Sequence, residues 1–420
     1  MAVSAQTSRN LTVDELFGLL EDANSSIRSQ KARVEVAAHG VEEAKSQRLP
    51  DISASLSFSY NGNVLMTDRD FSDATGFSQP HFGNSFALEA RQVVYAGGAV
   101  DAGIKLAELQ HRQANVAVEQ TRDAQRFMAL GLYLDIFKAD NSIKVYERNI
   151  RLSERLIEDI RARQSQGMAL KNDVTRYELQ LETLRLGLRK FTDRRSVLNH
   201  QLCNALGLGA DVLVQPDSTV VAAAYSHATE QEWQNRALAS SPVLQQSELG
   251  IQASNQQLKL ARSAMRPEVA LMAVDNFAGP FTYDIPPIDK NFNIWYVGVG
   301  IRYSLSSLFK SNKSVRRAKS AVRQSMDSHA VAMEDVNNKV QEGYTLYEQS
   351  YADLRTQQKS VQLSSQNYTI MKDRYFSQLA LVTDMIDASN VKLDAELREV
   401  DARINIVYAY YKMKYLAGEI

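Results

Sequence analysis

The chain repeats itself, and this internal duplication constrains its fold more than any other feature of the sequence. Short motifs of the first half return in the same order in the second half, at an offset of 217 residues near the start of each half and of 211 residues further on. The matching pairs are Thr12-x-x-Glu15 with Thr229-x-x-Glu232, Asp173 with Asp384, and Gly207 with Gly418. The sequence therefore predicts two similar halves, residues 11–209 and 228–420, joined by a linker over 210–227.

Each half predicts the same order of elements: a helix, two strands, a very long helix, a turn and a returning helix. The switch from helix to extended chain falls at Pro50 and again at Pro267, because proline disfavours helical conformation in the residue before it. Apolar residues alternate with serine over 52–60, a period typical of a strand, whereas 61–84 is rich in turn residues and is expected to be a long loop. The expected strands lie at about 51–65, 83–95, 267–277 and 291–305.

The long helices carry a seven-residue repeat of apolar side chains, which is typical of a coiled coil. In the first half the repeat runs through Ile136, Ile143, Ile150 and Ile157. The last helix carries two stripes, one of alanines from Ala388 to Ala409 and one of larger residues from Leu393 to Tyr411. A helix with two stripes needs neighbours on both sides, so we expect a wall of helices. Its two hairpins turn near 167–173 and 378–384.

Composition removes several classes of protein. Lys and Arg number 48 and Asp and Glu number 49, and this balance argues against a nucleic-acid binder. The single cysteine, Cys203, excludes an intramolecular disulfide, and the six dispersed histidines suggest no metal site. Neither a phosphate-binding loop nor a nucleophile elbow is present, so we expect no enzyme, metal or cofactor.

The expected strands are long enough to cross a membrane, which takes ~9–11 residues per strand. Four strands cannot close a membrane barrel, whose known minimum is about eight, and open sheet edges are not tolerated in lipid. If the strands face lipid, several chains must pool them. The alternative is a soluble sheet on a helical bundle, an interaction scaffold without a channel. The strand pattern leaves both open, and the long coiled coils favour the pooled barrel.

The ordered set of motifs resembles the TolC family of bacterial outer-membrane efflux proteins over nearly the whole chain. The segments that carry the resemblance are 11–16, 44–56, Val94-Tyr95-Ala96-Gly97-Gly98, Arg163-x-x-x-Gly167, Asp173-Val174 and Ala205-Leu206-Gly207. The resemblance implies a mixed α/β membrane protein that forms a homotrimer. Its outer-membrane β-barrel has twelve strands, four per chain, and is continued by a long periplasmic α-helical coiled-coil barrel.

The function implied by the resemblance is passive export through a tripartite efflux or type I secretion system. The duct would cross the lipid bilayer of the outer membrane. It would receive its cargo from a periplasmic adaptor (membrane fusion) protein and an inner-membrane pump of the resistance-nodulation-division or ABC class. The chain departs from the family at Gln378, where glycine is usual, and at Ser306-Ser307, where Gly-Gly is usual. The soluble scaffold remains the alternative.

The resemblance also implies functional residues at the hairpin tips. The constricted entrance would be formed by Asp384, Asp387, Tyr375 and Asp173. For Asp173 and Asp384 a second role competes, because an acidic residue in the first turn stabilises a helix. The arginine that usually partners this tyrosine is absent near Ala380, so the resemblance implies a different latch or a looser one. Adaptor contacts, with turn packing as the alternative, are expected at Gly167, Met168, Ala169, Leu170, Gln378, Leu379, Ala380 and Leu381.

Aromatic residues of the strands form the last candidate group. Membrane barrels carry aromatic girdles at both interfaces. Ordinary packing of aromatic side chains within a sheet is the alternative. The girdle candidates are Phe58, Tyr60, Trp295 and Tyr303.

Overall fold

The computed structural model describes residues 7–209, 211–222, 225, 228–282 and 287–420. The expected linker, 210–227, therefore lies partly outside the described residues. By packing, the chain forms two compact units. The first, here the helical unit, comprises the chain up to Arg33, Asn115–Gln246 and His329–Ile420, and the second, the sheet unit, comprises Val34–Ala114 and Ser247–Ser328. Each unit draws on both sequence repeats.

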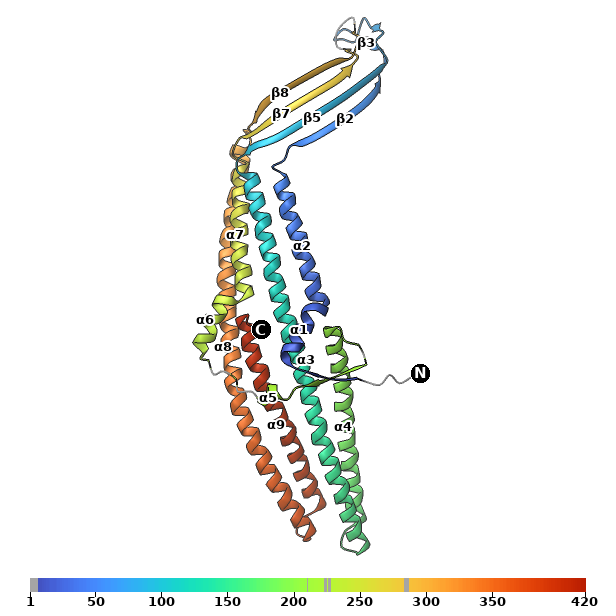
Figure 1. Ribbon diagram of the computed structural model, residues 1–420, viewed down its shortest axis with the longest axis vertical. Coiled ribbons are helices and arrows are strands. Elements are labelled where there is room, and N and C mark those ends of the chain that lie inside the picture. The colour runs from blue at the N-terminus through green and yellow to red at the C-terminus, as the bar shows by residue number, and fades with distance from the viewer. Residues whose placement is uncertain (1–6, 210, 223–224, 226–227, 283–286) are drawn as a thin grey trace. The chain divides into compact units, whose positions relative to one another are not determined.

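In the described part of the chain, short strands, shorter helices and four long helices lie in the helical unit or run into it (Figure 1). The two strands are β1 (Thr7–Leu11) and β6 (Val212–Pro216). The shorter helices are α1 (Val13–Ala23), α2 (Ser25–Ser46), α5 (Thr219–Ala222), α6 (Glu230–Ser240) and α7 (Pro242–Ser263). The long helices are α3 (Ala99–Ser165), α4 (Lys171–Leu206), α8 (Ser307–Phe376) and α9 (Val382–Ala417). Helices α3 and α4 form one antiparallel hairpin, and α8 and α9 form the other.

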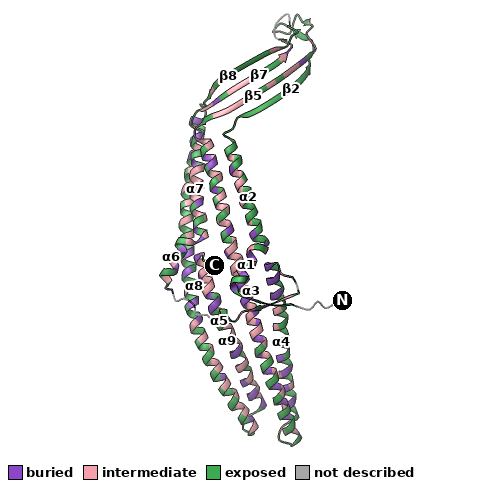
Figure 2. Cartoon of the chain, viewed as in Figure 1, coloured by how far each residue is buried: buried purple, intermediate pink, exposed green. Residues whose placement is uncertain are grey.

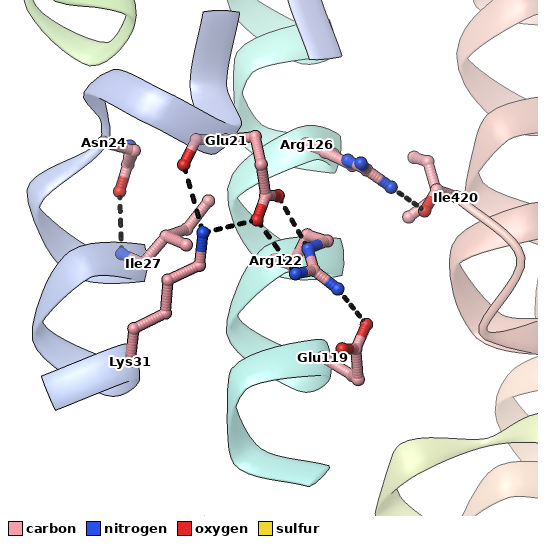
Figure 3. Close-up of polar contacts among 8 residues, drawn as sticks. All are labelled: Glu21, Asn24, Ile27, Lys31, Glu119, Arg122, Arg126 and Ile420. Carbon is pink, nitrogen blue, oxygen red and sulfur yellow. Dashed lines mark hydrogen bonds and ion pairs between the residues drawn. The ribbon is translucent and has the colours of Figure 1, made fainter. Parts of the chain in front are cut away.

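The first helices of the two halves begin alike. Thr12 and Thr229 each accept a hydrogen bond from the backbone of the glutamate three residues on, at 3.3 Å, while that glutamate accepts one from the threonine N–H. These are the two capping boxes that the repeated Thr-x-x-Glu motif predicts. Each helix is then interrupted, at Asn24 and at Ser241. The side chain of Asn24 starts α2 by accepting hydrogen bonds from two backbone N–H groups, as Figure 3 shows for Ile27.

The seven-residue repeat of α3 faces the core of the helical unit. Ile136 and Ile157 are buried, and Ile143 and Ile150 between them are half-buried. The alanine stripe of α9 is buried as well, which brings α9 close to its neighbours. Burying apolar area is the main stabilising term for such helices.

A parallel pair of strands joins the start of the chain to the segment between the halves. Strand β1 pairs with β6 in register from Thr7–Val212 to Leu11–Pro216. Buried Tyr133 of α3 stabilises this pair of strands. Its hydroxyl donates a hydrogen bond to the Leu11 carbonyl at 2.8 Å and accepts one from the Asp217 N–H at 2.7 Å. The sequence analysis did not predict this pairing.

The sheet unit is built on one antiparallel sheet in the order β2–β5–β7–β8. The strands are β2 (Asp51–Tyr60), β5 (Phe82–Ala96), β7 (Glu268–Gly279) and β8 (Phe292–Arg302). Strand β2 ends before the expected 65, and β8 ends before the expected 305. A small hairpin, β3 (Val64–Met66) with β4 (Thr75–Phe77), lies in the stretch expected to be a loop. Within the described chain, β2 and β8 have a neighbour on one side only, so both edges are open.

The two faces of this sheet differ in polarity. Residues directly opposite each other in antiparallel strands project to the same side, so the register assigns every side chain to a face. One face, the apolar face, presents Ile52, Ala54, Leu56, Phe58 and Tyr60 from β2, Phe82, Asn84, Phe86, Leu88 and Ala90 from β5, Leu271, Ala273, Asp275 and Phe277 from β7, and Asn293, Trp295, Val297, Val299 and Ile301 from β8. The opposite, polar face carries the serines of β2. Figure 2 shows that much of the sheet is exposed.

None of the described helices combines the length and apolar character that a membrane crossing requires.

Candidate functional site

The two hairpins turn with the same backbone geometry but with different residues. Gly167 and Gln378 occupy equivalent places and both adopt a left-handed conformation, with φ of 75° and 63°. In each turn the following N–H, of Met168 or Leu379, donates to a carbonyl five residues back, at 2.9 and 2.8 Å. This is the usual Schellman ending of a helix, which favours glycine at the left-handed position. Gln378 therefore keeps the turn at a cost in backbone strain.

The first turns of α4 and α9 are stabilised by equivalent carboxylates. Asp173 accepts a hydrogen bond from the Leu170 N–H at 3.3 Å, and Asp384 accepts one from the Leu381 N–H at 3.0 Å. Each carboxylate thus pairs with a backbone donor that the helix itself leaves free. Both aspartates have the helix-stabilising geometry that was one of the two roles expected from the sequence.

Asp173 also takes part in one of the contacts that join the two hairpins. The Tyr375 hydroxyl donates to Oδ2 of Asp173 at 3.2 Å, so the end of α8 is bonded to the start of α4. Tyr375 is 9% exposed, and burial, reinforced by the Asp173 carboxylate, raises its pKa to about 12. The phenol therefore stays protonated and keeps donating at neutral pH. This bond stands where the sequence left the partner of Tyr375 open.

Arg163 forms a second link between the hairpins. Its guanidinium donates to the Phe376 carbonyl at 2.5 Å and lies over the Phe376 ring, 4.4 Å from the centroid. A cation over an aromatic face is attractive, the more so where water is partly excluded. In the sequence Arg163 stands out only as part of the tip motif, and nothing in its spacing indicates this contact with the other repeat.

A buried apolar cluster supports both links. Its buried members are Leu156, Ile157, Ile160, Val174, Tyr177, Leu181, Tyr375, Val382 and Met385. The hydroxyl of Tyr177 is buried here without a hydrogen-bond partner among the described residues. The cluster draws on all four long helices, so the two tips pack as one body.

The tips border an open pocket of about 260 Å³, lined by Arg163, Gly167, Met168, Ala169, Leu170, Asp173, Tyr375, Gln378 and Ala380. It brings together six of the eight residues expected to contact an adaptor. The other two, Leu379 and Leu381, are 76% and 70% exposed. Large apolar side chains at such exposure are available to a partner.

The remaining entrance candidates lie on α9. Asp387 is exposed and has no polar partner in the described part of the chain. Asp384 is exposed as well, but it is engaged with the Leu381 N–H. Within one chain, the structure brings Asp173 and Tyr375 together and joins neither to Asp384 or Asp387.

The girdle candidates belong to the sheet unit. Phe58, Tyr60 and Trp295 lie on the apolar face and are strongly exposed, while Tyr303 follows the end of β8 and is less exposed. Tyr60 stacks on His81, with ring centroids 5.3 Å apart.

The polar face of the sheet holds an ion cluster that the sequence analysis missed. Glu268 pairs with Arg91 and lies 3.2 Å from Arg302. Arg91 lies on β5, Glu268 on β7 and Arg302 on β8. The three residues come from three strands, so only the register could reveal them.

A second missed cluster ties α1 and α2 to α3 (Figure 3). Glu21 accepts two hydrogen bonds from Arg122, at 2.7 and 2.9 Å, and lies 2.7 Å from Nζ of Lys31. The hydrogen bonds from Arg122 outweigh burial and lower the pKa of Glu21 to about 2. Arg126 meanwhile donates to the Ile420 carbonyl at 2.9 Å. The cluster has the character of a structural joint between helices.

In the described residues, no group of three His, Cys, Asp or Glu side chains is arranged to hold a metal ion.

Comparison with known proteins assigns the class. The model of the family described as outer membrane efflux protein matches residues 16–208 and again 233–419, one match within each repeat. The chain belongs to this family, which confirms the resemblance seen in the sequence and implies a location in the outer membrane.

Individual proteins that this chain resembles are also described as outer-membrane proteins. The chain is 20% identical over 406 residues to the outer membrane efflux protein BepC of Brucella suis biovar 1 (strain 1330), covering 94% of this chain and 83% of BepC. Among solved structures, it resembles the outer membrane protein VceC of Vibrio cholerae with a TM-score of 0.79 at 14% identity, covering 97% of this chain and 96% of VceC. It also resembles the Campylobacter jejuni CmeC outer membrane channel, with a TM-score of 0.76 at 14% identity and coverage of 97% and 85%. These similarities confirm the mixed fold of long helices and a sheet.

Proposed function

We propose that this protein is the outer-membrane exit duct of a tripartite efflux or type I secretion system. Three copies pool their strands into a twelve-stranded β-barrel and their long helices into a periplasmic tunnel. Cargo passes through passively, handed over by a periplasmic adaptor and an inner-membrane pump of the resistance-nodulation-division or ABC class. The observation that carries the proposal is the four-stranded sheet, which has one apolar face and two open edges.

In a single chain, this sheet leaves the outer hydrogen-bonding groups of its two edge strands unpaired. Unpaired edge strands expose backbone donors and acceptors, which lipid cannot satisfy. Pairing β8 of one chain with β2 of the next satisfies both edges at once and leaves the apolar face towards lipid. Closure needs more than one copy, since the smallest known membrane barrels have about eight strands.

Exposed apolar residues on the long helices also indicate contact with a second copy of the chain. Leu179 and Leu186 form an exposed stripe on α4, spaced by seven residues, and Leu363 and Ile370 form one on α8. Leu179 lies eight residues after the start of α4, and Ile370 lies six residues before the end of α8. With the tips level, the stripes differ in height by only ~3 Å, at ~1.5 Å per residue. We assign this seam to contact between α4 of one copy and α8 of its neighbour.

Cysteine pairs test the seam. Replacing Cys203, the one native cysteine, by serine gives a clean background for Leu179→Cys combined with Ile370→Cys. Oxidation should then link three chains into a covalent trimer. The control pair, Leu179→Cys with Leu346→Cys, places its two cysteines at different heights and should stay monomeric in denaturant. Equal cross-linking of both pairs would contradict the seam.

At the hairpin tips we assign two roles, which are binding of the adaptor and constriction of the entrance. The exposed leucines and the pocket they adjoin receive the adaptor, because exposed apolar side chains near a turn suit a partner helix hairpin. Asp387, with Asp384, forms rings of three carboxylates in the trimer, and such rings favour cations. Tyr375 bound to Asp173 holds the entrance narrow.

Single-channel recording in planar bilayers tests the duct and its entrance together. Asp387→Asn should lower cation preference, since it removes a charge without disturbing a helix cap. The control is Asp22→Asn on α1, which also removes an exposed carboxylate but lies away from the tips, and it should leave the preference unchanged. Failure to insert, with a soluble monomer in detergent-free buffer, would instead support the coiled-coil scaffold. Insertion with no effect of Asp387→Asn would keep the duct and reject this residue as part of the entrance.

A further inference from the structure

Charged residues of alternating sign cross the sheet at one end of its polar face. Asp51 begins β2 and lies opposite Arg91 of β5, while Glu268 begins β7 and lies opposite Arg302, the last residue of β8. An ion pair between Arg91 and Glu268 joins these two pairs of residues. Opposed residues of antiparallel strands share a face, so the four side chains form one row, negative, positive, negative and positive.

The two ends of this row lie on the two edge strands of the sheet, β2 and β8 (Figure 1). At the β8 edge, Arg302 shares Glu268 with Arg91, and its side chain is 77% exposed. At the β2 edge, Asp51 is exposed, and no ion pair or hydrogen bond joins its side chain to another described residue. The chain therefore presents a positive charge at one edge of the sheet and a negative charge at the other.

A second copy of the chain brings these two edges together, because the proposed function pairs β8 of one copy with β2 of the next. Strand β2 has 10 residues and β8 has 11, so two registers pair the whole of β2. One of them sets Asp51 opposite Ile301, which lies on the apolar face, and so turns the apolar side of β2 to the wrong face. The other sets Asp51 opposite Arg302 and keeps the apolar side chains of both strands together.

The stagger of a closed barrel supports the second register. A line across the sheet at right angles to its strands runs from Asp51 through Arg91 and Met272 to Gly298. In this register Gly298 faces Ser55 of the next copy, so the line climbs from position 51 to position 55 with each chain. Over three chains that is a stagger of ~12 residues, which for twelve strands ~4.8 Å apart gives a strand tilt of ~35°. Membrane barrels tilt by ~35–45°, and a slip of two residues, the smallest that keeps the faces, gives ~19° or ~46°.

The remaining polar side chains of β2 specify the register poorly. After Asp51 every residue of β2 on the polar face is a serine, at positions 53, 55, 57 and 59. Opposite the first two of these, β8 offers Gly300 and Gly298, which have no side chain to distinguish one serine from the next. Strands with such uniform faces are prone to slip. A charge pair at the end of the strands supplies the missing specificity.

We propose that Arg302 of one copy and Asp51 of the next form an ion pair that fixes the register between copies of this chain. The pair closes the row of charges into a ring, in which the same four charges recur in each chain and the signs alternate throughout. On the apolar face the same register sets Phe58 opposite Trp295, and both are strongly exposed in the single chain. The inference rests on the proposed function, which supplies the trimer, and it names the residues by which one copy recognises the next.

A double-mutant cycle tests the ion pair, with the rate at which purified trimers dissociate in dodecyl sulfate at a fixed temperature as its readout. Asp51→Asn should speed dissociation roughly tenfold, because three exposed pairs are lost from each trimer. In an Arg302→Gln background the same change should have an effect of about twofold or less, because its partner is already gone. The matched control is Glu89→Gln, a carboxylate that the register places on the polar face of the inner strand β5. Its effect should be the same in both backgrounds.

Disulfide trapping tests the register. In a Cys203→Ser background, Asp51→Cys with Arg302→Cys should be linked by diamide into a covalent trimer. Ser57→Cys with Arg302→Cys is the control and should stay unlinked, because Ser57 lies two turns of the pleat away from Ser53 on β2. Linkage of the control pair instead, or an equal effect of Asp51→Asn in both backgrounds, in trimers that conduct would refute this contact alone. A chain that neither forms trimers nor inserts would refute the proposed function and the contact with it.

Discussion

We expect the hydrogen bond between Tyr375 and Asp173 to help keep the entrance of the proposed channel closed. Replacing Tyr375 by phenylalanine removes one hydroxyl from the tip and leaves the ring in place. It breaks the 3.2 Å bond to Asp173 while the carboxylate keeps its bond to the Leu170 N–H. The change is therefore confined to the link between the two hairpins, and the first turn of α4 is preserved.

The size of the effect follows from the geometry. A hydrogen bond to a charged group contributes ~1.5–3 kcal/mol, and 3.2 Å is long for a hydroxyl donating to a carboxylate, so the lower figure of ~1.5 kcal/mol applies. That is a factor of ~10 in the closed-to-open ratio for one chain. If the three tips of a trimer open together, the effects add to ~4.5 kcal/mol, or on the order of a thousandfold.

Single-channel recording measures this ratio as the change in open probability or in mean conductance. Tyr177→Phe is the matched control, because it makes the same chemical change in the same buried cluster and its hydroxyl has no hydrogen-bond partner in the described structure. Tyr375→Phe should open the channel, and Tyr177→Phe should leave it as in the wild type. Equal behaviour of the two variants would refute the argument that this bond holds the entrance.

Three further predictions concern stability, each read from the thermal transition of the purified protein. Gln378→Gly should stabilise the second tip by ~1 kcal/mol by relieving its left-handed strain, and Gly167→Ala should destabilise the first by a similar amount through φ alone, since no atom lies within 4 Å of the added Cβ. Glu21→Gln should cost ~1–3 kcal/mol at neutral pH. Because the pKa of Glu21 falls from 4.5 to about 2 on folding, this stabilisation is complete above pH 4.5 and is lost as the pH falls towards 2. Thr229→Ala should cost ~1 kcal/mol by removing a helix cap.

Each of these three predictions would be contradicted by a specific result of the unfolding measurement. A Gln378→Gly protein less stable than the wild type would mean that the side chain of Gln378 contributes more than its backbone strain costs. A Glu21→Gln protein that loses stability in acid as steeply as the wild type would mean that other carboxylates dominate the acid limb. Loss of cooperative unfolding in Thr229→Ala would point to a role in docking α6 rather than in capping.

The features predictable from sequence are those with a short period or a local rule. The alternation over 52–60, the capping boxes at Thr12 and Thr229, and the seven-residue repeat through Ile136 all depend on residues close together in the chain. Each recurs in the second half, and duplication makes a weak pattern credible. The hairpin β3–β4 was missed because three-residue strands are too short to show an alternation.

Contacts between the repeats could not be predicted in this way. The bonds of Tyr375 to Asp173 and of Arg163 to Phe376 join residues more than 200 positions apart. The pairing of β1 with β6 is equally remote, and parallel pairing leaves no hairpin signal. The register that assigns Asp275 to the apolar face depends on two turns whose lengths the sequence does not specify. Such features arise from packing, and no local rule encodes them.

Duplication also explains why the two tips can differ in chemistry while sharing one geometry. The left-handed position is satisfied by Gly167 in one repeat and tolerated in Gln378 in the other, because the same two backbone hydrogen bonds close both turns. Asp173 and Asp384 likewise keep the same cap. Only Asp173 accepts a hydrogen bond from the hydroxyl of Tyr375, so one of the two equivalent carboxylates also joins the two hairpins. The other, Asp384, is left facing solvent beside Asp387, where the proposed entrance needs negative charge.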